Sequence, residues 1–249
     1  MTNIKLLFTC PHNGTEERGI VRDEAHLPNT CTVESGQGFS TENDILTSAL
    51  TKSISNNILK LSGKEPYTEI GTVDRKYVDL NRKEEYAFEQ SSLQAKQAYA
   101  EYHNRILLKI EEMLPQNEDG MAFLFDIHGT ELKKVQGRFI EVIIGTDEGN
   151  SIQALTEVDP NAFWGAKGLI PLLEEKGIRV FPRNSSQQTQ DHILDGGHTI
   201  QTYGSSRFKK GLVAIQVEVI HSIRDDRYCR VRFAADMADC ILKFVSPFI

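Results

Sequence analysis

Three short runs of almost continuous apolar residues constrain this chain more than any other feature. They lie at residues 4–10, 121–127 and 212–220. Strands that are apolar throughout are typical of a sheet buried between two layers of helices, whereas a half-exposed strand alternates polar and apolar residues. Segments with helical periodicity separate the runs, with apolar stripes around 45–59 and in a long stretch of roughly 83–114.

This alternation predicts an α/β fold. We expect a single-domain three-layer sandwich, with a mixed, mostly parallel sheet and helices on both faces. Further strands are expected at 67–73, 77–80, 139–144 and 178–181, and further helices at 161–176 and 230–245. No repeat, linker or low-complexity block divides residues 1–249, so they are interpreted as one domain.

The charge and cysteine content narrow the class of protein. A net charge of −7 argues against a nucleic-acid or anionic-membrane partner, because both need clustered cations. The apolar run at the start of the chain is too short for a signal peptide core or a membrane span. Without a Cys-x-x-Cys spacing, the cysteines are expected to be reduced and the protein cytoplasmic; they are Cys10, Cys31, Cys229 and Cys240. The sequence leaves the oligomeric state open.

Two histidines lie where predicted strands end. His12 follows the first run and precedes the turn-forming pair Asn13-Gly14, and His128 closes the second run. Ligands bind at the carboxyl ends of strands in α/β sheets, so the two imidazoles can converge on one metal ion. Asp126, two residues before His128 on the same face, is positioned to hold that imidazole in its metal-binding tautomer. A lone histidine at a strand end is more often structural, but the pairing favours a metal site.

A third ligand is expected from Glu16 or Glu17. Two histidines and a glutamate around one open position form the ligand set of a hydrolytic zinc site. Adjacent side chains diverge, so only one of the two carboxylates binds; the alternative is that both are solvated surface. Asp44 and Thr47, one helical turn apart, are interpreted as the N-terminal pair of a helix and not as a site.

Glu218 is the single acidic residue of the most apolar strand, 212–220. Gln216 and Glu218 share one face of this strand. A carboxylate among valines must be paired, protonated or close to a cation. Glu218 is therefore a candidate general base; the alternative is a buried ion pair with Arg224 or Arg227.

The segment 78–82, with the sequence VDLNR, is a third candidate constellation. Arg82 lies between a predicted strand and a helix start, where its guanidinium fork can bind a substrate carboxylate. The alternative interpretation is that Asn81 caps the helix and Arg82 is merely exposed.

Five short segments in the same order resemble the N-formylglutamate amidohydrolase family. They are 11–14 (PHNG), 78–82 (VDLNR), 126–129 (DIHG), 196–199 (GGHT) and 217–219 (VEV), so the resemblance spans roughly residues 5–225. The family is related in fold to zinc carboxypeptidases and aspartoacylases. The resemblance therefore implies a zinc carboxypeptidase-like sandwich.

The resemblance also implies one Zn2+ per chain, with His12 and His128 as ligands. In the similar phage poly-γ-glutamate hydrolases the ligand glutamate comes five residues after the first histidine, which points to Glu17 over Glu16. Glu218 would be the catalytic carboxylate and Arg82 the anchor of the substrate carboxylate. The remaining substrate-binding residues would be Asn81, Gly197, His198 and Thr199.

The expected function is zinc-dependent hydrolysis of the amide bond of a small N-acyl amino acid such as N-formylglutamate, or of a short acidic peptide. Water at the metal would be the nucleophile and Glu218 the general base. The chain departs from the family at 191–195 and at His198, so the substrate need not be formylglutamate. A metallo-carboxypeptidase, a γ-glutamyl-peptide hydrolase and a non-catalytic ligand-binding relative remain alternatives. Polar loops at 14–40 and 182–211 are expected to close over the substrate.

Overall fold

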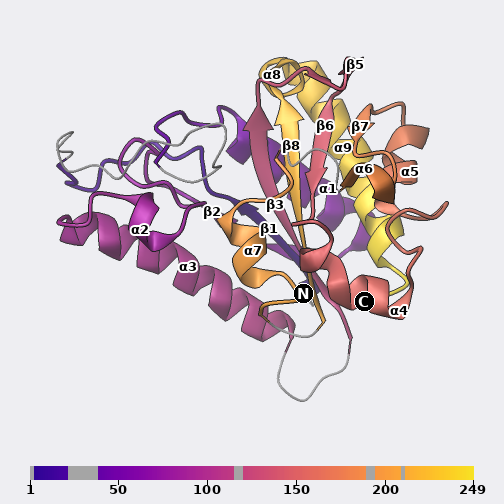
Figure 1. Cartoon of the computed structure of the whole chain (residues 1–249), viewed down its shortest axis with the longest axis horizontal. Helices are drawn as coiled ribbons and strands as arrows, with labels where there is room; N and C mark the ends of the chain where they lie inside the picture. Colours follow the sequence, from indigo (N-terminus) through magenta and orange to yellow (C-terminus); the bar gives the residue numbers. More distant parts are fainter. Residues whose placement is uncertain (1–2, 22–38, 115–119, 189–193, 209–210) are drawn as a thin grey trace.

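A six-stranded sheet forms the centre of the protein (Figure 1). The computed structural model describes residues 3–21, 39–114, 120–188, 194–208 and 211–249. In spatial order the strands are β2 (Glu65–Ile70), β1 (Asn3–Cys10), β3 (Ala122–Thr130), β8 (Leu212–Ile220), β6 (Val142–Gly145) and β7 (Val180–Phe181). Neighbouring strands are parallel except for β8 and β6, which are antiparallel. The sheet is therefore mixed and mostly parallel, as predicted.

Helices surround the sheet. The longer ones are α1 (Thr47–Ser62), α3 (Leu93–Met113) and α9 (Arg227–Val245). The shorter ones are α2 (Glu84–Ala87), α4 (Gln153–Val158), α5 (Leu169–Glu175), α6 (Ser185–Gln188), α7 (His198–Tyr203) and α8 (His221–Asp225), with a 3-10 turn at Asn150–Ile152. Two short strands, β4 (Lys134–Val135) and β5 (Arg138–Phe139), pair as a hairpin outside the main sheet.

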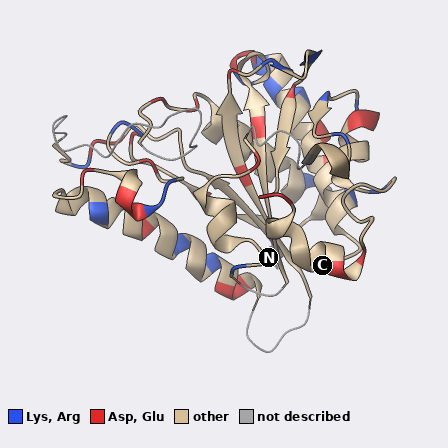
Figure 2. Cartoon of the chain, viewed as in Figure 1, with Lys and Arg blue, Asp and Glu red and all other residues tan. Residues whose placement is uncertain are grey.

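The strands divide the buried residues between two cores. Successive side chains of a strand point to opposite faces, so Leu6 and Phe8 of β1 join the core beneath α1, α5 and α9. Leu7 joins the core beneath α3 and α7. Figure 1 shows α3 on one side of the sheet and α9 on the other, and most charged residues lie on helices and loops (Figure 2). The predicted three-layer α/β fold is confirmed.

Several element boundaries differ from the sequence-based prediction. The predicted helix 83–114 is divided because Phe88 has an extended backbone and the Ser92 side chain caps a new helix, accepting a hydrogen bond from the Ala95 amide. Residues 77–80 form turns, with only an isolated bridge from Val78 to Phe88. The expected strand 139–144 is divided between β5 and β6, and the expected helix 161–176 begins only at Leu169.

Two further expectations concern the cysteines and membrane association. Cys10, Cys229 and Cys240 carry free thiols, whereas Cys31 lies outside the described residues. Among the described helices, none combines the length and the apolar composition that crossing a bilayer requires. Residues 22–38 of the predicted loop 14–40, and residues 189–193 and 209–210 of the predicted loop 182–211, also lie outside the described part of the chain.

Candidate metal centre

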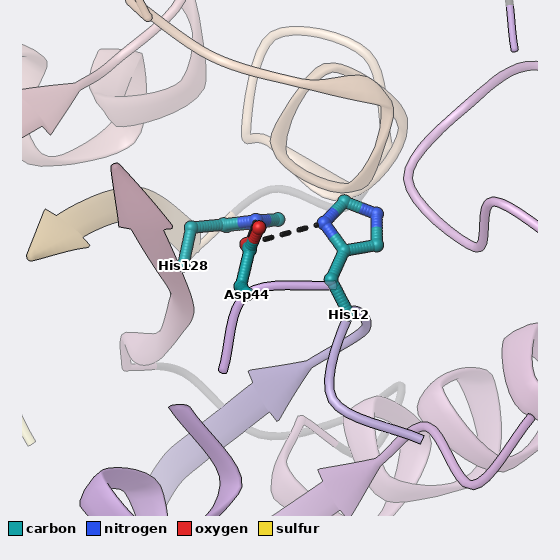
Figure 3. Close-up of side chains that lie close together, drawn as sticks. All are labelled: His12, Asp44 and His128. Atoms are coloured by element: carbon teal, nitrogen blue, oxygen red, sulfur yellow. Dashed lines mark hydrogen bonds and ion pairs between the residues drawn. The ribbon is translucent and has the colours of Figure 1, made fainter. Parts of the chain in front are cut away.

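Three buried side chains from distant segments meet at the carboxyl edge of the sheet. His12 lies two residues beyond β1, His128 lies near the end of β3, and Asp44 lies shortly before α1. One nitrogen of each imidazole and one oxygen of Asp44 lie within 4.8 Å of one another. Figure 3 shows the carboxylate between the two rings. The two predicted histidines are thus brought together because β1 and β3 are parallel neighbours.

The separations between the Asp44 oxygen and the two imidazole nitrogens fit a metal ion. His12 Nδ1 lies 3.3 Å and His128 Nδ1 lies 3.2 Å from the same atom, Asp44 Oδ2. Tetrahedral zinc, with bonds of about 2.0–2.1 Å to nitrogen and oxygen, places its ligand atoms about 3.3–3.4 Å apart. His12, Asp44 and His128 could therefore hold such an ion with one position left open.

Each imidazole has a buried carboxylate on its other nitrogen. His12 Nε2 lies 2.7 Å from Asp79 Oδ1, and His128 Nε2 lies 2.8 Å from Asp126 Oδ2. Such a carboxylate accepts the Nε2 proton, orients the ring and leaves the Nδ1 lone pair for a metal. The predicted contact between Asp126 and His128 is present. Asp79 belongs to the VDLNR segment, but nothing in its sequence pattern pointed to His12.

Arg75 connects two of these carboxylates and has no signal in the sequence. Its Nε and Nη2 donate to Asp79 Oδ2 at 3.1 and 3.0 Å, and its Nη1 donates to Asp44 Oδ1 at 3.4 Å. The Gly129 amide donates to the other oxygen of Asp44 at 3.0 Å. Buried charges need such partners, because an uncompensated one is costly to remove from water. Arg75 and Gly129 therefore fix the orientation of the Asp44 carboxylate.

The charged groups of the site shift one another's pKa values. Burial alone would raise the pKa of Asp44, but hydrogen bonds and charge from His12 and His128 hold it well below its usual value. Burial alone would lower the pKa of His128, but Asp126 and Asp44 raise it well above its usual value. These contacts therefore favour the protonated form of His128 and the ionised form of Asp44.

The structure does not bring Glu16 or Glu17 to the histidines. Glu17 is exposed and forms an ion pair of 3.7 Å with Lys76, and Glu16 accepts hydrogen bonds from Arg18 and Thr72. Asp44 occupies the place that was expected of a glutamate, so its interpretation as part of a helix-start pair is incomplete. Thr47 does donate to the Asp44 carbonyl oxygen at 2.6 Å, as such a pair would.

A left-handed turn separates Asp44 from α1. Leu46, the residue before α1, has a left-handed backbone with φ of 65° and makes no side-chain cap. Non-glycine residues adopt this conformation rarely, and it is enriched at functional sites. The Asp44 carboxylate, two residues earlier, points to the histidines and does not cap the helix.

Glu218 lies beside His128. The two residues are partners in the register of β8 and β3, and Glu218 is buried. Gln216 Nε2 donates to Glu218 Oε1 at 3.0 Å. Burial, with a smaller contribution from Asp44, raises the pKa of Glu218 to about 8, although the charge of His128 lowers it. A carboxyl group that titrates near neutral pH is suited to accept and return a proton.

The predicted substrate segment packs directly on Asn81. Asn81 Oδ1 accepts hydrogen bonds from the Thr199 amide at 2.7 Å and from the Thr199 hydroxyl at 3.0 Å. Asn81 Nδ2 lies 3.2 Å from His128 Nε2. A Cβ on Gly197 would lie 2.1 Å from Asn81 Nδ2, so only glycine allows this approach. Asn81 and Thr199 thus satisfy these polar groups within the protein, next to the candidate ligand His128.

Arg82 and His198 lie next to this segment. Arg82 Nη1 donates to the Asn81 carbonyl oxygen at 2.9 Å, and its Nε lies 3.8 Å from Asp79 Oδ2. The pKa of His198 is lowered to about 4 by burial and by the charges of Lys83 and Arg82. His198 is therefore neutral near pH 7 and lies in a positive field, which would attract an anion.

Comparison with solved structures identifies the fold. No family model matches the sequence, and no curated protein matches it. The crystal structure of an N-formylglutamate amidohydrolase from Ralstonia eutropha JMP134 aligns with 99% of this chain and 94% of its own, at 15% identity and a TM-score of 0.61. A gene product of Agrobacterium tumefaciens aligns with 98% of this chain and 91% of its own, at 13% identity and a TM-score of 0.57. The expected resemblance is confirmed at the level of fold.

Proposed function

We propose that this protein is a metal-dependent amide hydrolase that cleaves a small N-acyl amino acid such as N-formylglutamate. The proposal depends above all on one observation: two imidazole Nδ1 atoms meet one oxygen of Asp44 at a tetrahedral spacing, and each ring is backed by a buried carboxylate. Three protein ligands and an open position are typical of a catalytic zinc site. The shared fold with an N-formylglutamate amidohydrolase supports the same class of reaction.

The residues of the chain divide the chemistry among them. His12, Asp44 and His128 would hold one zinc ion, which when bound polarises the amide carbonyl and makes water more acidic. Glu218, beside His128, takes a proton from the attacking water and returns it to the leaving amine. Arg75 donates to Asp44 Oδ1 and so keeps the carboxylate of this ligand oriented.

Arg82 is proposed to bind the carboxylate of the substrate. Its side chain is 17% exposed and lies beside Asn81, which contacts the ligand His128. We expect Arg82→Lys to raise KM about tenfold or more with a smaller effect on kcat, because lysine cannot make the bidentate contact. Steady-state kinetics with N-acyl glutamate and with its α-carboxamide, which lacks the carboxylate of the amino acid backbone, test this. An equal loss for both substrates would contradict a role in carboxylate recognition.

Metal affinity is expected to rise with pH. His128 has a raised pKa in the metal-free chain, so it must release a proton from Nδ1 before it binds an ion. Affinity should therefore increase by about tenfold per pH unit for each proton released, up to the raised pKa of His128. Zinc titrations between pH 5.5 and 8, with a competing chelator, measure this slope. A zinc affinity that does not change with pH would show that metal binding releases no proton from His128, and would contradict its role as a ligand.

Metal stoichiometry of the purified protein tests the proposal first. We expect close to one zinc per chain, loss of hydrolysis on chelation, and recovery when zinc is returned. A substrate panel separates the related activities: N-formyl and N-acetyl amino acids, carboxypeptidase substrates, and γ-glutamyl peptides. Bound zinc with no turnover on any of them would favour a ligand-binding role, and no bound metal after zinc is supplied would refute the hydrolase.

A further inference from the structure

One buried guanidinium touches the chain directly after three residues of the metal centre. Arg224 of α8 is 2% exposed. Its neighbours are Ile45, Gly129 and Val219, which follow Asp44, His128 and Glu218 respectively. Ile45 lies in the turn before α1, Gly129 in β3 and Val219 in β8. Arg224 therefore connects three separate segments of the chain.

The contacts use different edges of the guanidinium. Nε donates to the Val219 carbonyl oxygen at 2.9 Å, and Nη1 donates to the Ile45 carbonyl oxygen. The backbone of Gly129 lies against the group itself, because a Cβ at this position would be 2.4 Å from Arg224 Cζ and 2.7 Å from Nη1. The glycine is therefore required for space, since its φ is not positive.

The predicted ion pair with Glu218 is replaced by these backbone contacts. Within the described residues, the hydrogen bonds and ion pairs of the Arg224 side chain go to Val219, Ile45 and the exposed carboxylate of Glu131, the last at 3.5 Å. A planar group with several fixed donors can hold two carbonyl oxygens in one geometry, which a lysine ammonium cannot reproduce. The carboxylate of Glu218 is thereby left for the metal centre.

The contact with Ile45 has the clearest consequence. Ile45 lies between the ligand Asp44 and Leu46, which has a left-handed backbone. Strained conformations of this kind persist only where surrounding contacts impose them. The Gly129 amide in turn donates to Asp44 Oδ2. Arg224 therefore fixes the turn that carries the carboxylate and the strand that receives it.

We infer that Arg224 is a positioning residue, which sets the separation of Asp44, His128 and Glu218 through the backbone that follows each of them. The inference rests on the proposed function for its catalytic meaning, but the positioning itself exists in the metal-free chain. It extends the site to an arginine on α8 that touches none of the reacting atoms.

Hydrogen exchange at one amide tests the positioning without any metal. In Arg224→Lys, we expect exchange of the Gly129 amide to accelerate at least tenfold, because its acceptor Asp44 is no longer held in place. Amides in the centre of β3, such as that of Leu124, should change by no more than the loss in global stability. Arg105→Lys is the matched control, since Arg105 binds Glu69 outside the centre. Equal changes at both amides in Arg224→Lys would reduce Arg224 to a structural role and overturn the inference.

Metal affinity is the second readout. Zinc should bind Arg224→Lys about tenfold more weakly than the wild type, which is the lower end of the usual effect of removing an outer-shell partner. If Arg224→Lys does not fold, Gly129→Ala tests the same contact, because its methyl group displaces the guanidinium without altering charge. Unchanged zinc affinity in a folded variant would overturn the inference. If the wild type binds no metal but the Gly129 amide responds selectively, the proposed function fails and the positioning stands.

Discussion

Asp44→Ala is expected to lose the bound metal entirely, whereas Glu17→Ala keeps about one zinc per chain. Asp44 supplies the one carboxylate that, among the described contacts, approaches both imidazoles. Its Oδ2 atom lies 3.3 Å from His12 Nδ1 and 3.2 Å from His128 Nδ1. Its removal leaves two histidines, which is one ligand fewer than catalytic zinc sites ordinarily have. Glu17 is exposed and contacts Lys76. Elemental analysis of both variants after dialysis measures the difference directly.

This pair of variants also decides between two assignments of the third ligand. The resemblance seen in the sequence implied Glu17, and the geometry points to Asp44. Circular dichroism should show both variants folded, and Asp44→Asn provides a milder change that keeps the side-chain volume. Retention of zinc in Asp44→Ala together with its loss in Glu17→Ala would refute the centre described above.

Glu218→Gln is expected to lower kcat by about 10²–10⁴-fold while zinc remains bound, which is the usual contribution of general acid–base catalysis. Glutamine keeps the shape of the side chain but cannot accept the proton. In the wild type, kcat should rise with pH through the pKa of Glu218, because the ionised form is the base. That pKa is about 8 in the metal-free chain, and a bound cation lowers it. The rising limb should therefore lie below pH 8 and disappear in the variant.

The Gln216→Ala variant is the control for this prediction. Gln216 Nε2 donates to Glu218 Oε1, so Gln216→Ala should shift the position of the rising limb without removing it. The pH dependence of kcat and the zinc content of each variant are measured together. A Glu218→Gln variant that retains wild-type kcat with metal bound would assign proton transfer to another group.

The fold could be predicted because its strands carry an unambiguous signal. The run 212–220 coincides with β8, and all of its residues are buried. The same reasoning failed for residues 77–80, because Val78 and Leu80 are buried in the core from turns, with only the isolated bridge from Val78 to Phe88. An apolar pattern alone does not distinguish residues buried in a strand from residues buried in a turn.

The metal centre could be predicted only in part. His12 and His128 stood out because strand ends are local features of a sequence. Asp44 lies 32 residues from His12, and a polar segment without a recognisable pattern separates them. Its carboxylate reaches the two histidines from the turn before α1, and this approach is a tertiary feature. The sequence offered Glu16 and Glu17 instead because both lie close to His12 along the chain, and the resemblance implied Glu17 of the two.

The distance of the ligands along the chain has a thermodynamic consequence. His12, Asp44 and His128 are separated by 32 and 84 residues, so an ion held by all three would cross-link the folded protein across long loops. Binding to the folded state alone adds about 1.4 kcal/mol of stability for each tenfold excess of free ion over Kd. The melting temperature would then report the occupancy of the metal site, and the stability of the folded protein would depend on the free metal concentration.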